Sequence, residues 1–122
     1  VLLMYAEACN ELGEGREALD KLEMVRARAR RTVHPADMTV GLPEITETGK
    51  EKLREIIWNE RRIELALEGH RFFDLIRADK VVPGYAEKMM KAHGKTNFSI
   101  AKHATFFIPQ KQVDISQGVL KN

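Results

Sequence analysis

The stretch NERRIELALEGHRFFDLIR, residues 59–77, decides the fold. Its first half continues an amphipathic helix expected over residues 50–67, because hydrophobic side chains recur there at helical spacing. Gly69 is typical of a helix end, and a second, shorter helix is expected over residues 70–79. The stretch therefore predicts two helices that meet at a Glu68–Gly69 corner. The hydrophobic face of the first helix consists of Leu53, Ile56, Ile57, Ile63 and Leu67.

Two carboxylates fall in the middle of this hydrophobic face. Glu60 and Glu64 are four residues apart, where like charges on an isolated helix repel by about 0.2–0.5 kcal/mol. A carboxylate that faces a core is tolerated only when a cation and hydrogen bonds satisfy it. Arginines lie close by in the sequence, so we predict a partly buried charge network that stabilises the Gly69 corner. Its members are Glu60, Arg61, Glu64, Glu68, Arg71, Asp74 and Arg77.

A pair of carboxylates could instead be the general acid and base of a glycoside hydrolase. Such pairs flank an open cleft, whereas Glu60 and Glu64 are one helical turn apart among arginines. A neighbouring arginine lowers the pKa of a carboxyl group, which is the wrong direction for a general acid. We therefore expect no catalytic residue here and a protein that is not an enzyme.

Residues 1–31 predict a hairpin of two antiparallel helices. Gly13 is expected to end the first helix in the left-handed conformation, and the second begins after Gly15. Cys9, the only cysteine, lies within the apolar stripe and is expected to be buried and inert. The hairpin is similar to a tetratricopeptide unit, of which a stable stack needs about three. The two stripes are Leu2, Tyr5, Ala6, Cys9 and Leu12, and Ala18, Leu22, Val25 and Ala29.

Proline and glycine residues divide the rest of the chain into segments. Residues 32–49 contain two prolines and two glycines and predict an irregular linker. Residues 50–92 predict helices around the Glu68–Gly69 corner, including a short one that Pro83 begins. Residues 93–122 predict a polar loop, a short apolar run and a tail with one turn of helix at most. The expected fold class is mainly α, with long irregular loops and little strand.

Composition and charge exclude several classes of function. The chain has 20 Lys and Arg against 18 Asp and Glu, which does not suit a dedicated nucleic-acid surface. No apolar run approaches the roughly 20 residues of a membrane helix. The four histidines lack ligand spacing, so we expect no metal and no cofactor. A basic patch near the end of the second helix is expected to be solvated and to suit the helix C-terminus. That patch consists of Arg26, Arg28, Arg30 and Arg31.

The quoted stretch closely resembles the hallmark segment of the SusD-like (RagB/SusD) family. In that family a Glu-Arg-Arg-x-Glu-Leu helix leads to Glu-Gly-x-Arg-Phe-Phe-Asp-Leu-x-Arg. The predicted hairpin is similar to the family's last helical hairpin, with Glu23 where asparagine is usual. Residues 107–110 resemble its Pro-Ile-Pro-Gln element, with Phe107 in place of the first proline, and residues 120–122 resemble its Leu-x-Gln-Asn tail. The resemblance covers the chain in order and implies its C-terminal, helical portion.

This resemblance implies a surface lipoprotein of the outer membrane that binds glycans or other nutrients without transforming them. The implied partner is a SusC-like TonB-dependent transporter, which the tetratricopeptide-like scaffold would face. The lipid anchor would lie upstream, since Val1 is expected in mid-helix and Cys9 is not the anchor. Ligand-contacting residues are not carried over; the aromatic residues Trp58, Tyr85 and Phe98 are weak candidates. The alternative function is a tetratricopeptide-type adaptor that binds a protein.

Overall fold

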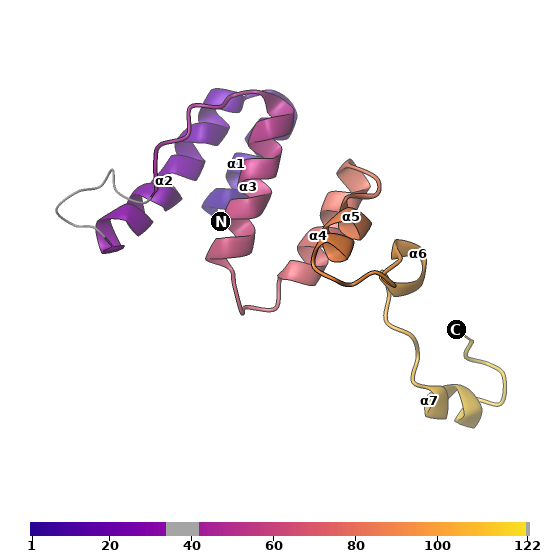
Figure 1. Ribbon diagram of the computed structural model, residues 1–122. Coiled ribbons are helices and arrows are strands. Elements are labelled where there is room, and N and C mark those ends of the chain that lie inside the picture. The colour runs from indigo at the N-terminus through magenta and orange to yellow at the C-terminus, as the bar shows by residue number, and fades with distance from the viewer. Residues whose placement is uncertain (34–41, 122) are drawn as a thin grey trace. The chain divides into compact units, whose positions relative to one another are not determined.

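The computed structural model describes residues 1–33 and 42–121, which form two compact units. The first unit is Val1–Arg71 and the second is Phe72–Asn122. Helices are the regular elements of the described residues, which include no strand (Figure 1), and this confirms the mainly α fold class. The helices are α1 (Leu2–Leu12), α2 (Gly15–Val33), α3 (Lys50–Glu64), α4 (Arg71–Val81), α5 (Tyr85–Ala92), α6 (Ile100–His103) and α7 (Gln110–Ile115).

α1 and α2 form the predicted hairpin, and the turn between them depends on Gly13. Its φ of 86° is left-handed, a conformation that glycine adopts without the steric cost of a Cβ atom. The Gly13 N–H donates to the Asn10 carbonyl at 3.1 Å, and the Glu14 N–H donates to the Cys9 carbonyl at 2.8 Å. These two bonds satisfy carbonyls that the end of α1 would otherwise leave open.

The buried face of α1 is rotated from the predicted apolar stripe. Ala6 and Cys9 are buried as expected, but Leu2, Tyr5 and Leu12 are exposed. The buried face instead includes two polar side chains, Glu7 and Asn10, together with Leu3. Periodicity placed the stripe on the most apolar side of the helix, whereas hydrogen bonds to α3 draw Glu7 and Asn10 inward.

The core of the first unit lies among α1, α2 and α3. Polar contacts pair Glu7 with Trp58 and Glu11 with Arg54, so α1 and α3 are antiparallel. Each fully buried aliphatic side chain contributes about 1.5–3 kcal/mol relative to an exposed one. Burial also raises the pKa of the Cys9 thiol, which keeps it protonated and unreactive. The core residues are Leu3, Ala6, Cys9, Ala18, Leu22, Val25, Leu53 and Ile57.

α3 ends at Glu64, three residues before the predicted end. Leu67 has a φ of 68° and Gly69 a φ of 77°, so the backbone leaves the right-handed helical region twice before α4 begins. Leu67, predicted to lie on the hydrophobic face, is fully exposed instead. The corner therefore occupies residues 65–70 rather than Gly69 alone.

The second unit has a small aromatic and aliphatic core. Leu75 from α4, Ala86 from α5 and Phe98 from the following loop are its buried residues. Asp79 holds the two helices together, since its Oδ1 accepts the Ala86 N–H at 2.8 Å. The partly buried residues around this core are Phe72, Ile76, Tyr85, Met89, Met90 and Ile100.

Two local predictions for the second unit are wrong. α6 begins inside the stretch 93–102 that was predicted as loop, because Glu87 Oε1 accepts the Ile100 N–H at 3.0 Å and orders its first residue. The tail contains α7, whose six residues exceed the single turn expected. Pro109 precedes α7 and its carbonyl accepts the Gln112 N–H at 2.8 Å, which starts the helix.

Candidate functional site

A buried ion pair joins α2 to α3 in the first unit. Arg26 Nη1 donates to Glu60 Oε2 at 2.8 Å, with side-chain exposures of 10% and 8%. The second guanidinium nitrogen donates to the Pro43 carbonyl at 2.8 Å. Arg26 Nε lies 3.3 Å from Glu23 Oε1, a favourable charge contact without hydrogen-bond geometry. Glu60 thus has the buried cation that its place on the helix requires.

Arg30 and Glu23 attach the chain that returns from α2. Arg30 Nη1 donates to the Leu42 carbonyl at 2.8 Å, and its other nitrogen binds Glu23. The remaining oxygen of Glu23 accepts the Ile45 N–H at 3.1 Å. Side chains of α2 therefore replace the backbone ladder that an irregular segment lacks. Glu23 stands where the resembled motif usually has asparagine, and here both of its oxygens are engaged.

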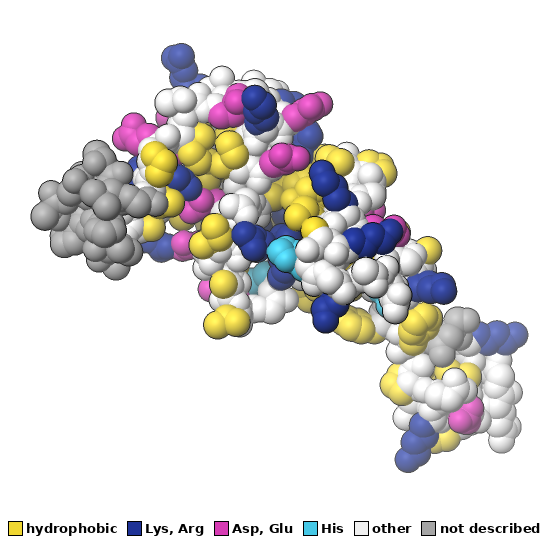
Figure 2. All heavy atoms as spheres, viewed as in Figure 1, with side chains coloured by type: hydrophobic (Ala, Val, Ile, Leu, Met, Phe, Trp, Pro, Cys, Tyr) yellow, Lys and Arg dark blue, Asp and Glu magenta, His cyan; other side chains and the backbone are white. Residues whose placement is uncertain are grey.

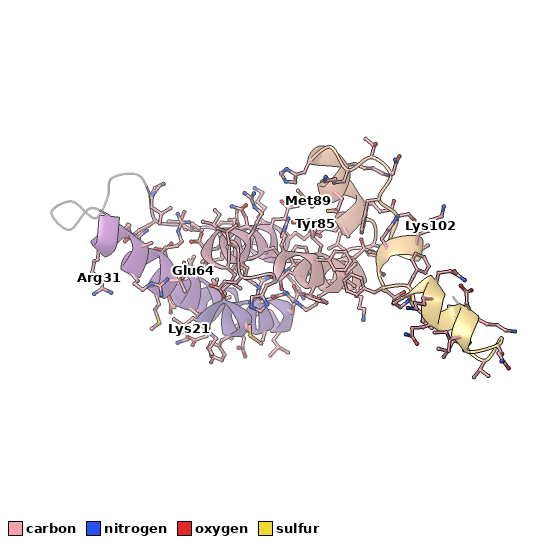
Figure 3. The ribbon with its side chains drawn as sticks, turned by 90° about the horizontal axis from the view of Figure 1, so that it is seen from below. Lys21, Arg31, Glu64, Tyr85, Met89 and Lys102 are labelled. Atoms are coloured by element: carbon pink, nitrogen blue, oxygen red, sulfur yellow. The ribbon has the colours of Figure 1, made fainter. Side chains whose placement is uncertain are left out.

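The prediction that the basic residues of α2 are solvated is wrong for Arg26 and Arg30. Both are buried, at 8% and 6% exposure. Arg28 is exposed and binds Glu64 of α3. Figure 3 shows Glu64, the last residue of α3, beside the neighbouring helix α2. Because the partners lie 34 and 36 positions away, no helical spacing within α2 could indicate them.

The seven residues of the predicted charge network are distributed over both units. The arginines that bind Glu60 and Glu64 come from α2, whereas the prediction named arginines of the hallmark segment as their partners. Glu68 lies 3.9 Å from His70 Nε2, while Asp74 and Arg77 are 3.3 Å apart on α4. Arg61 and Arg71 each make further interactions. A single network that joins all seven residues across Gly69 stays a prediction.

One of the three aromatic candidates for ligand contact is buried between α1 and α3. Trp58 Nε1 donates to Glu7 Oε1 at 2.8 Å, and the residue is only 4% exposed. A ring so covered has no face on which a ligand can stack, so its burial favours packing. Next along the helices, Arg54 binds Glu11 through two bonds of 2.5 and 2.8 Å. This guanidinium holds the pKa of the Glu11 carboxyl below its ordinary value.

The second aromatic candidate, Phe98, lies at a pocket of about 330 Å³ in the second unit. The pocket is a surface depression between the end of α5 and α6, and it combines an aromatic floor with polar side chains. Phe98 is 9% exposed and packs edge-on against Phe72, with ring centroids 6.4 Å apart. The lining residues are Met90, Gly94, Lys95, Thr96, Asn97, Phe98 and His103.

His103 is the pocket residue that sequence reasoning missed. Its ring stacks on Phe98 with centroids 5.4 Å apart and planes 24° apart. Its Nδ1 lies 2.9 Å from the Ser99 carbonyl oxygen and 3.1 Å from the Ser99 nitrogen. That contact leaves Nε2 as the ring nitrogen available to a ligand. The available signal was the four-residue spacing from Ser99, which places both groups on one side of a helical turn.

Tyr85, the third aromatic candidate, packs against the core of the second unit and does not line this pocket. Figure 3 shows Tyr85 and Met89 on α5 and Lys102 on α6. Tyr85 is half-buried and makes a further interaction of its own. Its proposed contact with a ligand therefore stays a prediction.

A second hollow, of about 390 Å³, lies beside the Arg26–Glu60 pair. Its charged side chains are already paired in part: Lys52 lies 3.6 Å from Glu47, and Glu60 binds Arg26. Asn59 Oδ1 accepts two bonds from Arg62. This hollow is therefore less suited to a ligand than the pocket beside Phe98, whose polar side chains carry fewer internal bonds.

Metal binding and membrane crossing are two further possibilities for the described residues. In residues 1–33 and 42–121, no three His, Cys, Asp or Glu side chains are grouped so that they could hold a metal ion. None of the helices in that part of the chain has the length and apolar character needed to cross a membrane.

Comparison with known proteins identifies the family. The model of the SusD family matches residues 1–122. The chain belongs to the SusD family. Among curated SusD-like proteins of Formosa agariphila, P38 is 37% identical over 83 residues, 67% of this chain and 16% of P38. P2 is 41% identical over 81 residues, 63% of this chain and 15% of P2. No solved structure matches the chain.

The SusD-family chain therefore spans about one-sixth of the length of the curated relatives it matches. The hallmark segment contains the α3 carboxylates Glu60 and Glu64 and the corner that follows them. The arginines that bind these two carboxylates come from α2. In this SusD-family chain the hallmark thus includes scaffold residues, while the pocket beside Phe98 is outside it.

Proposed function

We propose that this chain is part of a non-catalytic glycan-binding subunit of an outer-membrane nutrient uptake system. The observation that carries the proposal is the match to the SusD family over all 122 residues. The proposed partner is a SusC-like TonB-dependent transporter, and the ligand is a glycan or another nutrient. A lipid anchor outside this chain would hold the protein at the cell surface.

The architecture of the described residues supports different roles for the two units within this proposal. The first unit has buried charge pairs that connect its helices, which suits a scaffold. In the second unit, an aromatic floor lies beside hydroxyl and amide side chains, the groups with which proteins bind sugars. We therefore assign the transporter-facing surface to the hairpin of residues 1–31 and ligand contact to the pocket beside Phe98.

A binding screen with the full-length protein tests the proposal. Purified protein is titrated with a panel of neutral and acidic polysaccharides, and reducing ends are measured after prolonged incubation. We expect saturable binding of at least one glycan, no new reducing ends, and co-purification with a TonB-dependent transporter from membranes. Release of reducing ends would contradict the non-catalytic role. Binding to a soluble protein, with no glycan or transporter bound, would support the tetratricopeptide-type adaptor instead.

A further inference from the structure

The lysines of the second unit are concentrated in one stretch. Between Lys80 and Lys111 the chain has six lysines and a single acidic residue, Glu87. All six lysines are exposed. A surface with such an excess of one sign raises the local concentration of ligands with the opposite charge. Figure 2 shows one face of the protein, with lysine and arginine side chains marked.

The carboxylates of the second unit do not neutralise these lysines. In the part of this unit that the structure describes, each of the four carboxylates already binds another group, and an ion pair holds only one lysine, Lys91. Five exposed ammonium groups of the stretch therefore remain available to a ligand. The four carboxylate contacts are Asp74 with Arg77, Asp79 with the Ala86 N–H, Glu87 with Lys91 and the Ile100 N–H, and Asp114 with Gln110.

Lys95 brings this charge into the pocket beside Phe98. It lines the pocket together with Asn97 and His103. Of these residues, Lys95 and Asn97 supply two hydrogen-bond donors, an ammonium group and an amide N–H₂. Hydrogen bonds from charged donors to an anionic oxygen are about twice as strong as neutral ones. The donor set therefore suits an anionic group better than a neutral one.

We propose that the pocket between α5 and α6 binds an anionic substituent of the nutrient glycan, with Lys95 as the specificity-determining cation. This inference rests on the proposed function and deepens it by naming the substrate class: a polysaccharide that carries carboxylate or sulfate groups. Lys95 and the Asn97 amide contact the anionic group, the Thr96 side chain binds an adjacent hydroxyl, and the Phe98–His103 stack forms the floor.

The geometry favours a sugar over a nucleic acid. Nucleobases bind to exposed ring faces, whereas Phe98 is almost covered and His103 lies stacked on it. A volume of about 330 Å³ lies near the lower end of the range for small-ligand pockets, roughly 300–1,000 Å³. Such a pocket accommodates a short segment of a glycan chain, and the exposed lysines of the second unit attract the remainder.

Matched pairs of polymers test the inference in the full-length protein. Polygalacturonate is compared with the same polymer after reduction of its carboxyl groups, and dextran sulfate is compared with dextran. The pairs distinguish carboxylate from sulfate as the recognised group. We expect at least one charged polymer to bind about tenfold or more tightly than its neutral counterpart, since one charge-assisted bond is lost with the charge.

Two variants with the same loss of charge locate the effect. Lys95→Gln should weaken binding of the charged polymer about tenfold and leave any neutral glycan unaffected. Lys80→Gln removes another exposed charge, from the last turn of α4 and outside the pocket, and should weaken binding less than about twofold. Unchanged thermal unfolding shows that both variants remain folded.

The outcomes separate this inference from the proposed function. If neutral and charged polymers bind equally, the anionic specificity is wrong and the glycan-binding function stands. If no polysaccharide binds at all, the proposed function fails and this inference fails with it. Equal losses in Lys95→Gln and Lys80→Gln would show diffuse attraction and overturn the pocket. Preference for a single-stranded oligonucleotide over every glycan would overturn the substrate class.

Discussion

The two units differ in which basic side chains they contain and in whether those side chains are buried. The first unit, Val1–Arg71, has nine arginines and three lysines, whereas the second, Phe72–Asn122, has one arginine and seven lysines. In the first unit Arg26 and Arg30 are buried against carboxylates and backbone carbonyls. In the second unit the lysines between Lys80 and Lys111 are all exposed.

This difference follows from the chemistry of the two side chains. A guanidinium group is planar, weakly hydrated and able to direct several N–H donors at once, so it can be buried when carbonyls and carboxylates surround it. An ammonium group is compact and strongly hydrated, and it stays at the surface. The comparison teaches that arginine stabilises the first unit, while lysine gives the second unit its surface charge.

The largest expected effect tests whether the buried arginine stabilises the first unit. Arg26→Met leaves Glu60 buried without its cation and the Pro43 carbonyl without its donor. We expect the free energy of unfolding to fall by about 3–5 kcal/mol, the usual cost of removing one partner of a buried pair. Hydrogen exchange of the α3 amides measures this locally in the full-length protein.

Arg28→Met is the matched control for this variant. Arg28 pairs with Glu64 across the same two helices, but its side chain is 63% exposed. Solvent and salt screen such a pair, so the expected loss is below about 1 kcal/mol. Replacing both Arg26 and Glu60 with apolar residues should restore much of the stability. Equal losses for Arg26→Met and Arg28→Met would contradict the distinction between buried and surface arginines.

These arginines also mark the limit of what the sequence could predict. The hairpin turn at Gly13 follows from local spacing, and the buried stripe of Ala18, Leu22 and Val25 on α2 was predicted in the same way. The need of Glu60 for a cation was predicted from its place on an apolar face. The identity of that cation was not, because Arg26 lies 34 residues away and meets Glu60 only after the chain reverses.

The candidate site was predicted only in part for the same reason. Phe98 was named as a candidate because an aromatic residue stood in a polar loop, and it lies at the pocket. His103 was overlooked because a search for metal-binding spacing gives no signal for a ring that stacks on phenylalanine. Trp58 was named for its ring alone, and its hydrogen bond to Glu7 joins two residues that are 51 positions apart in the sequence. Local sequence patterns indicate helices and turns, whereas the partners of a side chain depend on how the whole chain folds.

The next largest effect concerns the core of the second unit. Phe98→Ala removes a buried ring that contacts Phe72 and His103, and we expect a loss of about 3 kcal/mol, the lower end of the range for buried phenylalanine. Phe106→Ala is the control, because Phe106 is 83% exposed although its ring also approaches Phe72. It should cost less than about 1 kcal/mol.

Hydrogen exchange of the α5 amides measures both phenylalanine variants. A small loss for Phe98→Ala would mean that the aromatic core contributes little, and that the second unit depends on other contacts. The comparison between the units would then have to include a difference in core packing as well as in cations.

The smallest expected effect compares one carboxylate from each unit. The pKa of Glu11 is lowered first by its hydrogen bond with the Arg54 side chain, and that of Glu87 first by the Ile100 backbone N–H. A lowered pKa in the folded state means that the charged form stabilises the fold. That contribution is present above the ordinary carboxyl pKa and is lost as the pH falls through the folded value.

Carboxyl carbon NMR of labelled glutamates can follow both groups in the full-length protein. Arg54→Gln should return the Glu11 pKa most of the way to its ordinary value, because the guanidinium is the main cause of the shift. Lys91→Gln should raise the Glu87 pKa only slightly, since the Ile100 N–H remains. If loss of the lysine moved Glu87 as far as loss of the arginine moves Glu11, the two cations would act alike. Different effects would instead show that an arginine side chain fixes the charge of Glu11, whereas a backbone N–H fixes that of Glu87 and its lysine partner contributes little.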